Sequence, residues 1–153
     1  MRNMLKEKGY FWPFRLLVAA IFGLAVLLII ISAINYFNTM RLRESEEKLM
    51  EGLRSAINAP TTPDKLENGL VLREDLSFAR GVYSVKPFSN RFNMPVDCIK
   101  FQSYRTNFEV IDEKRMNVKY DAKADVYFQC VYQSADPCSI VCYISIGKRP
   151  SPS

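Results

Sequence analysis

The 153-residue sequence contains no histidine. Histidine is the commonest general base near neutral pH and the usual partner of a catalytic serine or cysteine, so Ser-His-Asp and Cys-His sites are excluded. Glycine is scarce, with six residues, and no Gly-rich phosphate loop is present, so nucleotide binding has no support. N-x-S/T sequons are also absent. We therefore expect a protein that is not an enzyme and has no cofactor.

Adjacent acidic residues occur at Glu74-Asp75 and at Asp112-Glu113, a pairing that in some enzymes cleaves glycosidic bonds. Neighbouring residues on a strand point to opposite faces, however, and the second pair continues directly into Lys114-Arg115, as in a hairpin turn. These acids are therefore predicted to be solvated charges rather than a catalytic pair.

Cysteine is missing from the first 97 residues, and the four cysteines then follow at Cys98, Cys130, Cys138 and Cys142. An even number of cysteines in a domain of this size favours disulfides, which persist outside the reducing cytoplasm. A four-cysteine metal site would normally show two closely spaced pairs, which this spacing lacks. We expect disulfides, no bound metal and an extracytoplasmic C-terminal domain.

One long apolar run, residues 16–34, is free of charge. At about 1.5 Å rise per residue, a helix of this length crosses the roughly 30 Å hydrocarbon core of a bilayer. A cleaved secretory signal is the alternative, but its apolar region is normally shorter and ends in small residues. Here the large aromatics Tyr36 and Phe37 follow the run. The run is therefore predicted to be a retained single-pass membrane span.

The basic residues on either side of the run bear on its orientation in the membrane. Lys and Arg numbers are nearly equal on the two flanks, and Arg15 directly adjoins the span on its N-terminal side. Together with the cysteines, this predicts a cytoplasmic N-terminus and an extracytoplasmic C-terminal domain. Bases and acids are almost balanced over residues 60–153 and form no basic stripe, so nucleic acid is not expected as a partner.

After the span, apolar residues recur at Leu42, Leu49 and Leu53 among charged residues, a spacing that predicts an amphipathic helix. The pattern ends before Pro60. One helix could thus run from about Pro13 through the membrane and beyond, because proline is tolerated in a first helical turn. The narrow apolar stripe of this extension could pack on the chain's own β domain or on other copies.

From Gly69 onward the pattern changes to short alternating runs separated by Pro, Asn and Asp, which predicts about six or seven strands. The expected strands are approximately 70–78, 82–85, 98–104, 108–111, 116–120, 126–132 and 140–146. The last two form a hairpin, and a turn near Asp136 would place Cys130 opposite Cys142 and Phe128 opposite Ile144.

Three disulfide connectivities are possible. The hairpin register favours Cys130–Cys142 together with Cys98–Cys138. The alternative is Cys98–Cys130 with a turn-closing Cys138–Cys142, although residues four apart in an extended strand lie about 13 Å apart, beyond disulfide reach.

The segment Lys6-Glu7-Lys8-Gly9, directly before Tyr10 and the apolar run, resembles the class III signal of type IV pilin-like proteins, including archaeal ones. In that family a prepilin peptidase cuts after the glycine, and the retained apolar helix anchors the subunit and then packs into a filament core. The resemblance implies processing at Lys8, Gly9 and Tyr10, with cleavage between the last two. Phe14 stands where many bacterial pilins carry glutamate, which favours an archaeal or minor-pilin variant.

The sequence thus predicts an α+β chain: one long N-terminal transmembrane and amphipathic helix, followed by a small antiparallel all-β, sandwich-like domain with disulfides. The expected segments are a basic cytoplasmic N-terminus (1–15), a membrane span (16–34), an amphipathic extension (35–59), a linker (60–68), an extracytoplasmic β domain (69–148) and a disordered tail (149–153). The expected function is that of a pilin-like filament subunit or minor pilin, with the lipid bilayer, identical or different subunits bound through the helix, and a prepilin-peptidase-like enzyme as partners. The alternative is a permanently anchored accessory protein whose β domain binds a protein or a cell-surface polymer.

Overall fold

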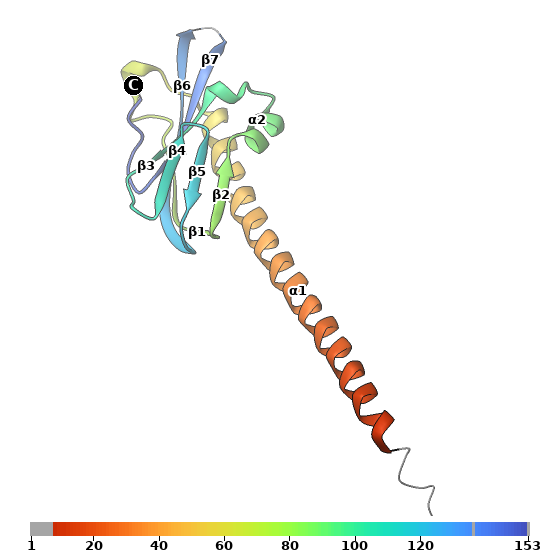
Figure 1. Cartoon of the computed structure of the whole chain (residues 1–153). Coiled ribbons are helices and arrows are strands. Elements are labelled where there is room, and N and C mark those ends of the chain that lie inside the picture. Colours follow the sequence, from red (N-terminus) through yellow and green to blue (C-terminus); the bar gives the residue numbers. More distant parts are fainter. Residues whose placement is uncertain (1–7, 136, 153) are drawn as a thin grey trace, which may run out of the picture. The chain divides into compact units, whose positions relative to one another are not determined.

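A computed structural model describes residues 8–135 and 137–152 of the chain (Figure 1). The chain divides into two compact units, Met1–Thr39 and Met40–Ser153. We call the second unit the head. The helix α1 (Lys8–Asn58) belongs to both units, and we call its residues 12–39 the stem and its residues 40–58 the extension.

The helix α1 begins earlier than the expected start near Pro13, so Pro13 lies inside its first turns. Pro13 is the sixth residue of the helix, beyond the first four, whose N–H groups have no intrahelical partner. Proline has no N–H, so the Gly9 carbonyl, four residues earlier, lacks its usual donor. The helix ends at Asn58, two residues before Pro60, which cannot continue it.

The described part of the head contains two sheets, in line with the strands predicted from the alternating pattern. The four-stranded sheet has the order β1-β6-β7-β3 and the three-stranded sheet has the order β2-β5-β4. The strands are β1 (Val71–Phe78), β2 (Gly81–Ser84), β3 (Ile99–Ser103), β4 (Phe108–Asp112), β5 (Arg115–Val118), β6 (Ala122–Ala135) and β7 (Cys138–Ile146).

The prediction of a purely antiparallel domain is wrong at one pair. Strand β3 pairs with β7 in parallel, with Ile99 beside Cys142 and Ser103 beside Ile146, so the larger sheet is mixed. A disulfide explains this parallel pairing. The Cys98–Cys138 disulfide joins the residue before β3 to the first residue of β7, so both strands start at the same end of the sheet.

The short helix α2 (Lys86–Phe92) lies in a segment that the sequence pattern assigned to turns. Its end signals are visible in the sequence, because Pro87 occupies the first turn and Asn93 adopts the left-handed conformation that ends helices. Two 3-10 turns complete the head, η1 (Pro63–Lys65) and η2 (Val96–Cys98).

The core of the head lies on one face of the four-stranded sheet, where the extension, α2 and the three-stranded sheet contribute side chains to one apolar cluster. Strand β7 is buried on both faces, which explains why its sequence, CSIVCYISI, is almost continuously apolar. On the opposite face a smaller cluster forms around Cys98, Val131, Cys138, Val141 and Tyr143.

Two segments predicted to be irregular are hydrogen-bonded to the sheets. In the linker, the Thr61 N–H donates to the Cys130 carbonyl (2.8 Å) and the Thr61 carbonyl accepts from Tyr132 (2.9 Å). In the segment predicted to be a tail, the Gln102 side-chain amide exchanges two 3.0 Å hydrogen bonds with the backbone of Ser151. Ser153 lies outside the described residues.

Candidate functional site: the exposed stem and its packed extension

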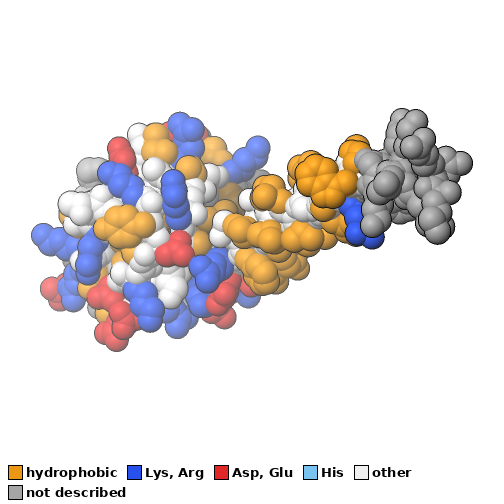
Figure 2. Space-filling model, turned by 60° about the horizontal axis from the view of Figure 1, so that its bottom comes forward, with side chains coloured by type: hydrophobic (Ala, Val, Ile, Leu, Met, Phe, Trp, Pro, Cys, Tyr) orange, Lys and Arg blue, Asp and Glu red, His pale blue; other side chains and the backbone are white. Residues whose placement is uncertain are grey.

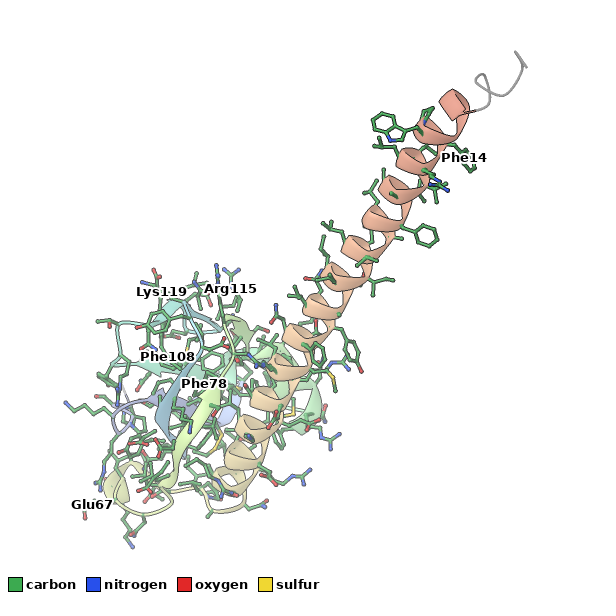
Figure 3. The ribbon with its side chains drawn as sticks, turned by 90° about the horizontal axis from the view of Figure 1, so that it is seen from below. Phe14, Glu67, Phe78, Phe108, Arg115 and Lys119 are labelled. Atoms are coloured by element: carbon green, nitrogen blue, oxygen red, sulfur yellow. A yellow bond between two sulfur atoms is a disulfide. The ribbon has the colours of Figure 1, made fainter. Side chains whose placement is uncertain are left out.

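The stem is a helix whose apolar side chains are exposed along its length (Figure 3). Every residue from Trp12 to Thr39 is exposed except Val18, which is half-buried. Trp12 is 72% exposed, Phe22 68% and Ile29 69%. Apolar side chains of this size are normally buried in a water-soluble domain, so the stem needs an apolar surrounding.

The stem meets the length and composition requirements of a membrane span. The described chain contains one helix of this kind, and it lies near the N-terminus. Arg15 is the single charged residue between Trp12 and Met40, and it precedes the apolar run. A basic residue at the end of a span can extend its charge toward the headgroups.

In contrast to the stem, the extension is packed against the sheets of the head. Leu49, Leu53 and Ala56 are fully buried in the core. At Gly52 the helix comes so close to the sheet that an added Cβ would lie 2.3 Å from Cε2 of Phe128. The apolar stripe that could have packed on other copies is therefore covered by the chain's own domain.

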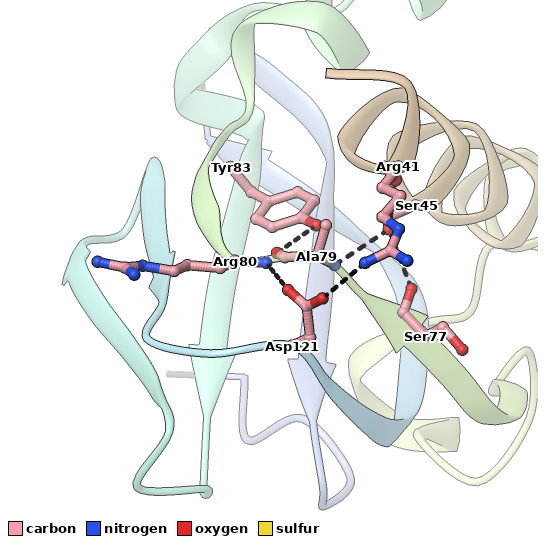
Figure 4. A network of polar contacts seen from close by, with 7 residues as sticks. All are labelled: Arg41, Ser45, Ser77, Ala79, Arg80, Tyr83 and Asp121. Atoms are coloured by element: carbon pink, nitrogen blue, oxygen red, sulfur yellow. Dashed lines mark hydrogen bonds and ion pairs between the residues drawn. The ribbon is translucent and has the colours of Figure 1, made fainter. Parts of the chain in front are cut away.

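A network of polar contacts joins the start of the extension to the sheets (Figure 4). Arg41 forms an ion pair with Asp121 (3.2 Å), and the other carboxylate oxygen of Asp121 accepts the Arg80 N–H (2.7 Å). The buried Ser45 hydroxyl lies 3.0 Å from the Ser77 carbonyl and accepts the Ala79 N–H (3.4 Å). These contacts fix the extension at the end of β1.

The same network explains one shifted pKa. The Tyr83 hydroxyl donates to the Ala79 carbonyl (3.0 Å), and its ring packs edge-on against Phe78. Burial raises the pKa of Tyr83, although hydrogen bonds with Ser45 and Ala79 oppose the shift. This network was not predicted from the sequence. Ser45, which interrupts the apolar stripe four residues before Leu49, is the sequence signal that points to it.

The four cysteines form two disulfides, Cys98–Cys138 and Cys130–Cys142. This is the connectivity that the hairpin register favours. Cys130 lies directly opposite Cys142 in the β6-β7 ladder, and Phe128 lies opposite Ile144. The first disulfide joins segments 40 residues apart, and the second joins the two strands of one hairpin.

Of the two acidic pairs, Asp112-Glu113 lies in ion pairs on the surface. Asp112 bonds to Arg115 (2.7 Å) and Glu113 to Lys100 (2.9 Å). The Arg115 guanidinium lowers the pKa of Asp112, so this carboxyl stays ionised. No group of three or more metal-ligating side chains occurs in the part of the chain that the structure describes.

Lys8, Gly9 and Tyr10, the expected processing residues, lie in the first turn of α1. Residues 1–7, which the cleavage would remove along with Lys8 and Gly9, lie outside the described residues.

On the head, one pocket of about 320 Å³ is lined mainly by apolar and aromatic side chains at the face of β6 and β7 opposite the main core. Its lining includes Leu66, Tyr132, Tyr143 and Pro152. Such a surface could take a small apolar or ring-shaped group.

The fold and the stem together define a chain with one candidate membrane-spanning helix and a disulfide-bonded α+β domain. No family model, curated protein or solved structure matches the chain.

Proposed function

We propose that the protein is a membrane-anchored, extracytoplasmic structural subunit of the pilin-like kind, which assembles with other subunits through its stem. The observation that supports this proposal best is the contrast along α1. The extension buries Leu49 and Leu53 in its own head, whereas the stem leaves residues such as Phe22 and Ile29 exposed.

In this proposal the stem first spans the bilayer. Residues 16–34 match the hydrocarbon core in length, and Arg15 marks the cytoplasmic end. The two disulfides require an oxidising environment, which agrees with a head on the outer side. The N-terminus is then cytoplasmic and the head extracytoplasmic.

After assembly, the stem packs against the stems of other subunits. A helix that is apolar on all sides loses little when lipid tails are replaced by neighbouring apolar helices, because both environments exclude water. Ala19 and Gly23 are four residues apart and therefore share a face, where small side chains allow two helices to approach closely. The stem is thus suited to the membrane and to a helical bundle in turn.

Processing gives the most specific test of the pilin-like proposal. If a prepilin-peptidase-like enzyme cuts between Gly9 and Tyr10, the intact mass of the protein from its native membrane corresponds to a chain that begins at Tyr10. A mass that retains residues 1–9 contradicts processing. Co-purification of a tagged and an untagged copy in mild detergent then tests assembly independently of cleavage.

The second candidate is a permanently anchored accessory protein whose head binds a partner. The pocket near Tyr132 and Tyr143 supports it, since an exposed tyrosine beside an apolar depression is a common recognition surface. This candidate predicts an uncleaved, monomeric chain. Substitution of Tyr132 by alanine would then abolish partner capture without affecting self-association.

A further inference from the structure

The strand directions bring four chain segments to one end of the head. Strands β1, β3 and β7 finish at this end and β6 begins there, because β1 and β7 are antiparallel to β6 and β3 is parallel to β7. In the smaller sheet β5 finishes there, and β2 and β4 begin. The segments are 79–80, 104–107, 119–121 and 147–149.

Direct contacts confirm that these segments lie together. The Tyr104 N–H donates to the Ile146 carbonyl (3.1 Å), and the Lys119 N–H donates to the Asn107 carbonyl (3.0 Å). Asp121 accepts the Arg80 N–H and pairs with Arg41 of the extension. The extension therefore enters the head at this same end.

The charge at this end is strongly one-sided. Its four segments carry one acidic residue, Asp121, and five basic residues, which we call the basic end: Arg80, Arg105, Lys119, Lys148 and Arg149. All five are exposed. Lys119 pairs with Glu109 (3.3 Å), and the other four have no ion-pair partner among the residues that the structure describes. Lys and Arg side chains are spread over the face of the head that Figure 2 presents.

The opposite end of the head has no such excess. Its described connecting segments carry four bases and four acids: Lys65, Lys86, Arg91 and Lys114 against Asp64, Glu67, Asp97 and Glu113. Lys114 and Asp97 form an ion pair there. The small positive charge of the whole chain thus hides a clear asymmetry between the two ends.

Two of the basic side chains pack on neighbouring residues. The Lys148 ammonium lies over the Tyr104 ring, 5.7 Å from its centroid, and the Arg105 side chain covers Gly147 so closely that an added Cβ would lie 2.8 Å from Cγ. Tyr104 and Tyr120 are about half exposed, at 49% and 59%. Exposed tyrosines among basic residues are typical of surfaces at the level of lipid headgroups.

We propose that the basic end binds the phosphate groups of anionic phospholipids. The short connection between the membrane span and the head indicates why phospholipids are the ligand. Residues 35–40 separate the apolar run from Arg41, and even fully extended they span only about 20 Å. The Arg41 end of the head is therefore held near the bilayer surface, where phospholipid phosphates are the most abundant anions. Each base near an anionic surface strengthens binding about fivefold at physiological salt. This inference rests on the proposed membrane anchoring.

The experiment uses the full chain in lipid nanodiscs and measures backbone hydrogen exchange of residues 104–107 and 119–121. Discs of phosphatidylcholine are compared with discs that contain phosphatidylglycerol. We expect slower exchange in the anionic discs, and the difference should disappear at 1 M salt, where the Debye length is only about 3 Å. Replacing Arg105 and Lys148 by glutamine should reduce the slowing about fivefold for each base. The matched control, Lys65→Gln with Lys86→Gln, removes two exposed bases from the opposite end and should leave it unchanged.

Equal hydrogen exchange in both kinds of disc overturns the proposal. So does a control variant that reduces the slowing as much as the replacement of Arg105 and Lys148 does. Slowing by soluble polyphosphate but not by anionic discs overturns it in favour of a surface polymer. If the chain does not co-elute with neutral discs, it is not anchored in the bilayer. That result contradicts both the membrane anchoring and the lipid proposal. The salt dependence of the wild-type protein keeps the test informative if the double variant folds poorly.

Discussion

At the scale of single residues, Gly52 is a position where the extension lies very close to the sheet. The Phe128 ring that faces it is fully buried in the core and has little room to move. Elsewhere in α1 a glycine is merely a small cost to helix stability, but here its missing side chain makes space for an aromatic ring.

Replacing Gly52 by alanine should therefore destabilise the head. Overpacking costs about 1–3 kcal/mol, and the better helix propensity of alanine returns up to about 1 kcal/mol. We expect a net loss of about 1–2 kcal/mol in the free energy of unfolding, measured by urea denaturation of the full chain in mild detergent. Gly23→Ala is the control, since an added Cβ there meets nothing within 4 Å. A Gly52→Ala variant as stable as the wild type contradicts the packing described.

Because of Tyr83, we expect the stability of the head to depend on pH in the alkaline range. Because burial raises its pKa, the folded state holds the phenolic proton more tightly than the unfolded state does. This contribution to stability is complete below about pH 10, the ordinary tyrosine value, and is lost as the pH rises from there through the raised pKa.

Tyr83→Phe should thus lower stability by about 1 kcal/mol near neutral pH, because the hydrogen bond to the Ala79 carbonyl is lost. It should also flatten the fall in stability above pH 10. Unfolding experiments from pH 8 to pH 11 measure both effects. Tyr120→Phe, which removes an exposed hydroxyl, should change neither, and a similar alkaline slope in the two variants would count against the account.

At the scale of elements, the two disulfides constrain chain loops of different lengths. In the loop-entropy description, a longer loop gives more stabilisation, about 4 kcal/mol for a separation of 40 residues and about 3 kcal/mol for 12. The Cys98–Cys138 bridge also fixes the parallel placement of β3 beside β7.

Replacing both Cys98 and Cys138 by alanine should therefore cost more stability than replacing both Cys130 and Cys142. Urea denaturation of the two double variants gives the comparison, and mass mapping of the non-reduced protein checks the pairing. The reverse order of stabilities, or a Cys98–Cys130 linkage in the native protein, would contradict this account.

The stem allows a test that leaves the folded monomer intact. A leucine at Gly23 has open space around it in the monomer and favours the helix, so any defect reports contacts with other molecules. We expect Gly23→Leu to weaken self-association of the full chain in nanodiscs at least fivefold, measured by energy transfer between labelled copies. Ala25→Leu, on the other side of the helix, should have a smaller effect. Unchanged association in both variants would argue against assembly through this face.

At the scale of the whole molecule, the sequence predicts the order of elements well and their spatial arrangement less completely. The apolar run, the strands and the opposed pair Cys130 and Cys142 follow from local periodicity, which the sequence displays directly. The parallel pairing of β3 depends on a contact between residues 40 positions apart, which periodicity does not report.

The same distinction applies to the candidate site. The exposed stem could be predicted from its composition, but the burial of the extension required knowledge of what lies opposite Gly52 and Leu53. Likewise, near balance of charge along the chain concealed the basic end, because Arg80, Arg105 and Lys148 come together only through the strand directions.

The most direct test of assembly through the stem is photo-crosslinking of the full chain in its native membrane. A photoreactive amino acid replaces Phe22, which is exposed on the stem, or Tyr132, which is exposed on the head. The account predicts a ladder of crosslinked subunits from position 22 and little or none from position 132. Lipid adducts and monomers alone from position 22 would contradict assembly through the stem and leave it as a simple anchor.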